Sequence, residues 1–290
     1  MTHHFGLKKA RFKDPRQFKF HKTFGAFPIS SVPDAFDFGT VPAIKDQGPT
    51  HWCTSFSGSY VIDNILKDIT SPEYIAQKTV LVGKLNPVNF TGTTPQLSDK
   101  ALVKFGSILR NLSPFLFGRD DPNQIADPKN WPASLDAQAK DELGASFEIT
   151  TDGYQDLFDA IRAALYVKKL PVRLAVWFQP SWESASDGIV SADMVQNFQP
   201  DINGHSIQVD PAVVLKNGVQ YLRVPNSWGT GVGDKGYYYF SREAVNLTFY
   251  VSAYDPESNV EAVKGEQWNV FTFIFDELVS IFRAITNLFK

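Results

Sequence analysis

The chain has 290 residues, of which 43% are hydrophobic and 14% aromatic, enough for a sizeable core in one large domain or two lobes. Its formal net charge is −3, so no overall basic field attracts nucleic acid, and we expect no nucleic-acid partner. A single cysteine excludes an intramolecular disulfide and favours a cytoplasmic or otherwise reducing compartment.

Residues 1–32 are basic, aromatic and loop-like, and they end just before a turn-rich stretch. We expect an extension ahead of the folded body, either a short pro-segment or an arm that covers a cleft, with residues 28–33 as a possible cleavage point. No apolar stretch follows the first charges, so we expect no secretory signal peptide. The glycosylation triplets at Asn89, Asn111 and Asn246 are then expected to be chance matches.

Helices are predicted in the first part of the chain. After Cys53, apolar residues recur at helical spacing through Ile65, so an amphipathic helix is expected to start close to the cysteine. A second helix is predicted over residues 97–109. A third is predicted over 153–169, where Leu157, Ile161 and Leu165 share one face.

Strands are predicted in the later part. Short runs rich in β-branched and aromatic residues are separated by Gly, Asn, Asp and Pro, at residues 171–178, 205–215, 219–226 and 236–242. Helices followed by strands indicate an α+β protein with two lobes.

Residues 256–290 are predicted to form a C-terminal extension. Between residues 268 and 290 apolar side chains step by three or four, which predicts a strongly amphipathic helix. Asp276, Glu277 and Arg283 interrupt it too early for a membrane span. Packing on its own protein and docking to a protein partner are the two main interpretations, and contact with a membrane surface is the least favoured.

Cys53 lies at the predicted start of a helix, where partial positive charge stabilises a thiolate. Free cysteines are also among the most often buried residues, so an inert core residue is the alternative interpretation.

Three stretches in order decide between these interpretations: AIKDQGPTHWCTSFSGSY around Cys53, NGHSIQV around His205, and VPNSWGTGVGDKGYYYF from Val224. Together they resemble the papain family of cysteine peptidases. Gln47 stands six positions before Cys53, as the family's oxyanion glutamine does, and Asn226 opens the family's Asn-Ser-Trp-Gly motif.

The resemblance implies a papain-like fold over residues 33–255, with a helical N-terminal lobe that carries the nucleophile and a β-barrel-like C-terminal lobe. It implies that Cys53 is the nucleophile and His205 its acid and base, while Asn226 orients the histidine ring. Trp228 would shield that hydrogen bond, and Gln47 would donate to the oxyanion.

The chain departs from the family pattern before the nucleophile. His51 stands where the family has a glycine beside the substrate, so its side chain is expected to narrow the site. Its use as the base is disfavoured because it lies only two residues from Cys53. Trp52, Gly92, Thr93 and Gly204 complete the expected substrate-binding set, with His51 and Trp228.

No cofactor or metal is expected. Gly231, Gly233 and Gly236 match a dinucleotide pattern but lead into a predicted strand rather than a helix. The few scattered histidines and one cysteine do not form a zinc motif.

Two functions stay open. The first is a cysteine endopeptidase acting on a protein or peptide substrate through a Cys53–His205 ion pair and an acyl-enzyme. The second is a papain-fold binding or structural subunit of a larger assembly with weak or no proteolytic activity.

Overall fold

The computed structural model describes residues 18–88, 90–139, 144–195 and 204–256. The chain divides into two units after Pro256, and the described residues all belong to the first unit. The helix predicted within residues 268–290 therefore lies outside the described residues. Within the described part, no helix has the length and apolarity needed to cross a membrane.

Four helices form one lobe. They are α2 (Cys53–Leu66), α3 (Pro72–Gly83), α4 (Pro95–Phe105) and α5 (Pro122–Ala126). The last three share one starting arrangement, a polar N-cap followed by proline, with Ser71, Thr94 and Asp121 as the caps. Their apolar faces meet in one core, which contains Trp52, Phe56, Tyr74, Val80, Ile108, Phe117, Ile125, Trp131 and Leu135.

Two five-stranded sheets form the other lobe. Sheet A has the order β1 (Phe18–Lys19), β3 (Ala145–Glu148), β10 (Tyr250–Asp255), β4 (Val172–Trp177) and β6 (Gly204–Val209). Sheet B has the order β2 (Phe36–Asp37), β7 (Ala212–Lys216), β8 (Val219–Pro225), β9 (Tyr237–Ser241) and β5 (Ile189–Val190). Among the described strands only β1–β3 and β5–β9 pair in parallel.

Three short helices belong to the sheet lobe: α1 (Phe20–Phe24), α6 (Leu157–Ala163) and α7 (Arg242–Asn246). The helix predicted over 153–169 is α6 continued by a π-helical turn, Ala164–Lys168. Asp156 caps α6 by accepting from the Asp159 N–H at 2.9 Å. The loop residues before the cap therefore lie outside the helix.

Residues 18–32 pack against the sheet lobe, although the sequence predicted that they precede the folded body. β1 adds a parallel strand to β3, and the Phe18 and Phe24 rings lie 5.8 and 5.0 Å from the Phe147 ring. Phe20 is 1% exposed. This part of the N-terminal segment thus contributes to the apolar core of sheet A.

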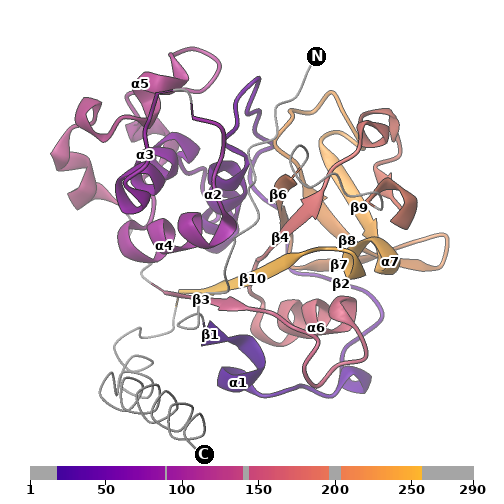
Figure 1. The fold of residues 1–290 in the computed structure, drawn as a ribbon. Helices are drawn as coiled ribbons and strands as arrows, with labels where there is room; N and C mark the ends of the chain where they lie inside the picture. Colours follow the sequence, from indigo (N-terminus) through magenta and orange to yellow (C-terminus); the bar gives the residue numbers. More distant parts are fainter. Residues whose placement is uncertain (1–17, 89, 140–143, 196–203, 257–290) are drawn as a thin grey trace, which may run out of the picture. The chain divides into compact units, whose positions relative to one another are not determined.

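The two lobes meet along α2 and β6. Figure 1 shows α2 to α5 grouped on one side of this unit and the strands of both sheets on the other. The Ser57 and Ser206 hydroxyls lie 2.7 Å apart across the junction. The Tyr60 hydroxyl donates to the Asn226 carbonyl at 3.1 Å. The fold is the α+β two-lobe arrangement that the sequence predicted.

Candidate active site

Cys53 is the first residue of α2 and is completely buried. The backbone N–H groups of Ser55 and Phe56 donate to the Trp52 carbonyl, which starts the helix without a side-chain cap. The first-turn N–H groups and the helix dipole therefore place partial positive charge at the sulfur's end of α2.

His205 is the second residue of β6 and is also completely buried. Its Nε2 lies 2.8 Å from Asn226 Oδ1. The Ser227 N–H donates to the same Oδ1 at 2.8 Å, which identifies this atom as the amide oxygen. An amide oxygen only accepts, so Nε2 of His205 carries the hydrogen in this bond.

Aromatic rings enclose the imidazole. The Trp228 ring stacks on it with centroids 4.8 Å apart and an interplanar angle of 22°. The Trp182 ring meets it edge-on at 6.4 Å. Because Trp228 and Trp182 are 3% and 0% exposed, water is kept away from the histidine–asparagine hydrogen bond.

Gln47 is held by the asparagine motif. Its backbone N–H donates to the Ser227 carbonyl at 2.8 Å, and its side-chain Oε1 accepts from the Ser227 hydroxyl at 2.7 Å. Its Nε2 donates to the Thr50 carbonyl at 2.9 Å. Gly229 has a φ of +73°, and a Cβ there would lie 3.3 Å from Asp46 Oδ2, so glycine suits this close approach.

A buried ion pair anchors the same loop to the C-terminal half of α2. Lys45 Nζ lies 2.6 Å from the Asp63 carboxylate. Burial lowers the pKa of Lys45 and raises the pKa of Asp63, while each charge partly offsets the shift of the other. The Lys45 N–H also donates to the Tyr60 hydroxyl, the same hydroxyl that binds the Asn226 carbonyl.

Strand β4 contributes residues of the sheet lobe that lie beside Cys53 and His205. Ala175 packs against Cys53 together with Tyr250, and the next residue, Val176, is paired with His205. The Ser57–Ser206 hydrogen bond lies one helical turn after Cys53 and one residue after His205. The structure thus brings Cys53, His205, Asn226 and Gln47, the four residues predicted to be catalytic, to one junction between the lobes.

The predicted substrate-binding residues are more scattered. His51 is half-buried in the bend before α2, and Gly92 and Thr93 are buried just before α4. Gly204 begins β6 next to His205 and pairs with Trp177.

Trp52 packs in the core of the helical lobe, and its predicted role in substrate binding stays a prediction. Its ring stacks on Phe90 at 3.8 Å and 3°, lies 6.2 Å from Phe117, and is 2% exposed. This side chain belongs to the core of the helical lobe, because the chain turns into α2 with the indole pointing inward.

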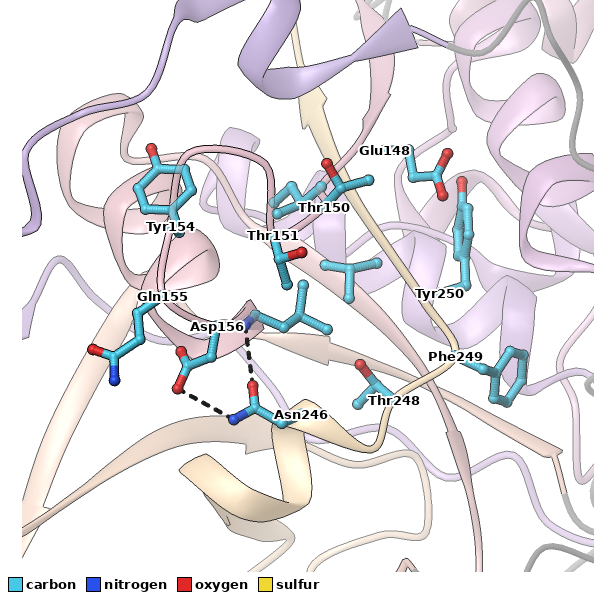
Figure 2. Close-up of a pocket in the computed structure, with 13 residues that line it drawn as sticks. Glu148, Thr150, Thr151, Tyr154, Gln155, Asp156, Asn246, Thr248, Phe249 and Tyr250 are labelled. Atoms are coloured by element: carbon cyan, nitrogen blue, oxygen red, sulfur yellow. Dashed lines mark hydrogen bonds between the residues drawn. The ribbon is translucent and has the colours of Figure 1, made fainter.

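A surface pocket of about 520 Å³ lies elsewhere on the sheet lobe, between β3, α6, α7 and the start of β10 (Figure 2). Its two carboxylates are paired: Glu148 with Lys19, and Asp156 with Arg242. In Figure 2 the Asn246 amide donates to Asp156 and accepts from the first turn of α6. Neither Cys53 nor His205 lines this pocket, although Tyr250, which shares a hydrophobic cluster with Cys53, does.

Several supporting residues were not predicted. Ser227, Ser57, Tyr60 and Ser206 lie within the three stretches that carry the resemblance, but no role was predicted for them. Trp182 lies outside those stretches. Because the contacts of Ser57, Ser206 and Trp182 join residues far apart in the chain, sequence spacing carried no signal for them.

No family model matches the chain. It is 28% identical over 236 residues to the cysteine proteinase COT44 of Brassica napus, covering 78% of this chain and 64% of that protein. It is 25% identical over 242 residues to the cysteine endopeptidase RepA of Oryza sativa subsp. japonica, covering 81% of this chain and 58% of that protein. The chain thus spans less than two thirds of the length of these relatives.

The fold is similar to that of solved cysteine proteases. Xylellain, a cysteine protease from Xylella fastidiosa, superposes with a TM-score of 0.67 at 17% identity, over 87% of this chain and 95% of that one. In its ordered motifs, its sequence relatives and its fold, the chain is therefore similar to papain-like cysteine proteases.

Proposed function

We propose that the chain is a cysteine endopeptidase that hydrolyses peptide bonds in a protein or peptide substrate. One observation carries the proposal: the imidazole of His205 is oriented by Asn226 at 2.8 Å under the Trp228 ring, at the junction where Cys53 begins α2. An imidazole fixed in this orientation can accept and donate protons in catalysis. Without such a function, burying this polar ring would only cost free energy of folding.

The first half-reaction follows from the tautomer. With Nε2–H donated to Asn226, Nδ1 is the nitrogen that takes the thiol proton of Cys53, which forms a thiolate–imidazolium pair. The sulfur attacks the carbonyl carbon, and the oxygen becomes an oxyanion. The imidazolium then protonates the departing amine as the C–N bond breaks, leaving an acyl-enzyme on Cys53.

The oxyanion is stabilised by two donors. They are the Cys53 backbone N–H, at the positive end of α2, and Nε2 of Gln47. An amide nitrogen has two hydrogens; we assign one to the Thr50 carbonyl and the other to the oxyanion. Ser227 fixes the orientation of the Gln47 side-chain amide by donating its hydroxyl hydrogen to Oε1.

The second half-reaction reverses the proton transfers. Nδ1 of His205 removes a proton from water, whose oxygen attacks the acyl carbon. The tetrahedral intermediate collapses, the C–S bond breaks, and the imidazolium returns its proton so that the thiol and the neutral imidazole are restored.

A second candidate function is a papain-fold binding or structural subunit. The complete burial of Cys53 and His205 favours it, because a substrate reaches these atoms only if the cleft opens. The helix predicted within residues 268–290 would then be the docking element.

The deciding experiment is labelling of the full chain with an epoxide that alkylates only activated thiolates, followed by peptide mapping. We expect a single modification at Cys53 near neutral pH. A His205→Ala variant should resist the epoxide, because its thiol no longer ionises against an imidazolium.

Hydrolysis of a peptide library by the same samples is the companion measurement. A folded wild-type chain that resists the epoxide and cleaves no peptide would exclude the endopeptidase and leave the binding subunit. A His205→Ala variant labelled as fast as wild type would show that the thiol reacts without the imidazole.

A further inference from the structure

A buried guanidinium lies under the first turn of α2. Arg173, the second residue of β4, has a side chain only 2% exposed. Its Nη1 donates to the Thr54 carbonyl and to the Ser98 hydroxyl, each at 3.2 Å. Its Nη2 donates to the Pro95 carbonyl at 2.6 Å and forms an ion pair with Asp99.

These contacts cross from one lobe to the other. Arg173 belongs to sheet A, whereas Thr54 is in α2, and Pro95 and Asp99 are in α4. One side chain therefore ties α2, the start of α4 and β4 together. Since Gly92 and Thr93 directly precede α4, the same side chain also anchors the segment predicted to bind substrate.

The hydrogen bonds and the ion pair of Arg173 lead to Cys53 by two routes, one through Thr54 and one through Asp99. Thr54 is its neighbour in the chain, so the hydrogen bond to that carbonyl acts on the turn that holds the sulfur. At the other end, Asp99 Oδ2 accepts from the Tyr250 hydroxyl at 3.0 Å, and Tyr250 belongs to the same hydrophobic cluster as Cys53 and Ala175.

β4 also sets the position of the imidazole. Ala175 packs on Cys53 and Val176 is in register with His205, two and three residues after Arg173. A strand advances by about 3.3 Å per residue and resists compression, so it acts as a spacer. Fixing Arg173 on Thr54 thereby fixes how far the sulfur lies from the imidazole.

The fit around the guanidinium is close. A Cβ on Gly58 would lie 3.2 Å from Arg173 Nη1 and 3.0 Å from a Leu102 methyl, so α2 has glycine where it passes over the guanidinium. A buried ion pair is often replaceable by apolar residues without loss of stability, so stability alone gives a weak reason for a charge here. A role in holding these elements at a fixed distance accounts both for the buried charge of Arg173 and for the glycine at position 58.

We propose that Arg173 is a positioning residue: by clamping the first turn of α2 and the start of α4 to β4, it sets the separation of Cys53 and His205. The proposal rests on the proposed function. It assigns Arg173 no contact with substrate.

The test compares Arg173→Lys with Arg242→Lys in the full chain. Arg242 also pairs with two carboxylates, Asp156 and Asp159, but these ion pairs join α7 to α6 within the sheet lobe. Lysine keeps the positive charge but lacks the planar set of N–H donors of the guanidinium group. We expect kcat per epoxide-titrated site to fall about 10- to 100-fold for Arg173→Lys, because small misplacements of reacting groups are costly. Arg242→Lys should keep the wild-type kcat.

The pH profile of alkylation gives a readout that a purely structural role would not change. In Arg173→Lys the acidic limb of iodoacetamide alkylation at Cys53 should move to higher pH, because a more distant imidazolium stabilises the thiolate less. Tyr250→Phe removes a single hydroxyl from the network, folds without a new charge, and should change kcat and the profile in the same direction, to a smaller extent.

The outcomes separate the two proposals. A wild-type chain without epoxide reactivity or hydrolysis would overturn the proposed function itself. An active wild type, with Arg173→Lys and Tyr250→Phe matching its kcat per titrated site and its alkylation profile, would overturn the positioning role and leave Arg173 a structural residue.

Discussion

Two neutral amides define the chemistry at the scale of single residues, and one serine orients both. Ser227 donates its hydroxyl to Gln47 Oε1 and its backbone N–H to Asn226 Oδ1. Each amide thereby presents its oxygen to Ser227, which leaves the nitrogen of Gln47 for donation. The same residue therefore orients both the proposed oxyanion donor, Gln47, and Asn226, which binds the histidine.

Gln47→Ala should lower kcat by about 10²–10³ with little change in folding, as expected for the loss of one oxyanion donor. Ser227→Ala should lower kcat less, since it removes only the bond that orients the Gln47 amide. Steady-state kinetics of both variants and of the double variant form a double-mutant cycle.

The double-mutant cycle distinguishes coupled from independent roles of Ser227 and Gln47. If Ser227 acts through Gln47, adding Ser227→Ala to Gln47→Ala should cost almost nothing further. Additive losses would contradict that coupling. Ser113→Ala, whose hydroxyl donates to the Phe115 carbonyl outside the site, is the control.

The residues of the candidate site could be predicted from order and spacing, because Gln47 and Cys53 are close in sequence and Asn226 opens a recognisable motif. Their supports could not. Tyr60 and Asn226 are joined across 166 positions, and Arg173 and Thr54 across 119. Neither pair leaves a local pattern, so only the folded chain shows that they meet.

At the scale of elements, polar burial explains the helix that the sequence did not predict. In α3 the polar residues Glu73, Gln77 and Lys78 are buried with the apolar ones, so no amphipathic period appears. Glu73 is accommodated because it accepts from the Phe117 N–H at 2.8 Å and pairs with Arg110. Partners elsewhere in the chain thus override hydrophobic periodicity.

Local turn chemistry explains a misplaced helix end. α4 was predicted to reach Leu109 but ends at Phe105, where Gly106 takes a φ of +61°. Glycine accepts this left-handed conformation readily, and it terminates the helix. The glycine was visible in the sequence, and the apolar residues beyond it belong to the core rather than to the helix.

Phe20→Ala tests whether residues 18–32 are part of the fold. Phe20 is 1% exposed, and its ring lies 4.9 Å from that of Phe24. We expect a loss of about 3–5 kcal/mol in the free energy of unfolding, the usual cost of truncating a buried phenylalanine. Urea unfolding monitored by circular dichroism measures it.

Lys22→Ala, an exposed substitution in the same short helix, is the matched control and should change stability little. A Phe20→Ala chain as stable as wild type would mean that the N-terminal segment is only loosely attached.

At the scale of the whole molecule, a second buried charge cluster joins the lobes. Asp210 lies just after β6, accepts from Asn64 of α2 at 3.1 Å, and pairs with Arg223 of β8 at 3.0 Å. Burial raises the pKa of Asp210 to about 6, and the Arg223 charge offsets only part of that shift.

Stability should therefore depend on pH through Asp210. Its folded pKa lies above the value of 3.8 expected without burial, so the folded state binds the extra proton. The stability contributed by this proton is complete below about pH 4 and is lost as the pH rises through about 6.

Asp210→Asn mimics the protonated acid and removes this titration. The free energy of unfolding of wild type, relative to Asp210→Asn, should decrease between about pH 4 and 6. Urea titrations of both chains across this range measure the difference. A constant difference, or one that grows in favour of wild type as the pH rises, would show that Asp210 is not held protonated.

The contacts that dock the lobes, Ser57 with Ser206 and Arg173 with Thr54, adjoin the two reactive residues in the chain. In a molecule whose lobes have separated, Cys53 lies in the helical lobe and His205 lies in the sheet lobe, so the two side chains no longer meet. If the chain is the proposed endopeptidase, a misfolded or incompletely synthesised copy would therefore not hydrolyse peptide bonds in the proteins around it.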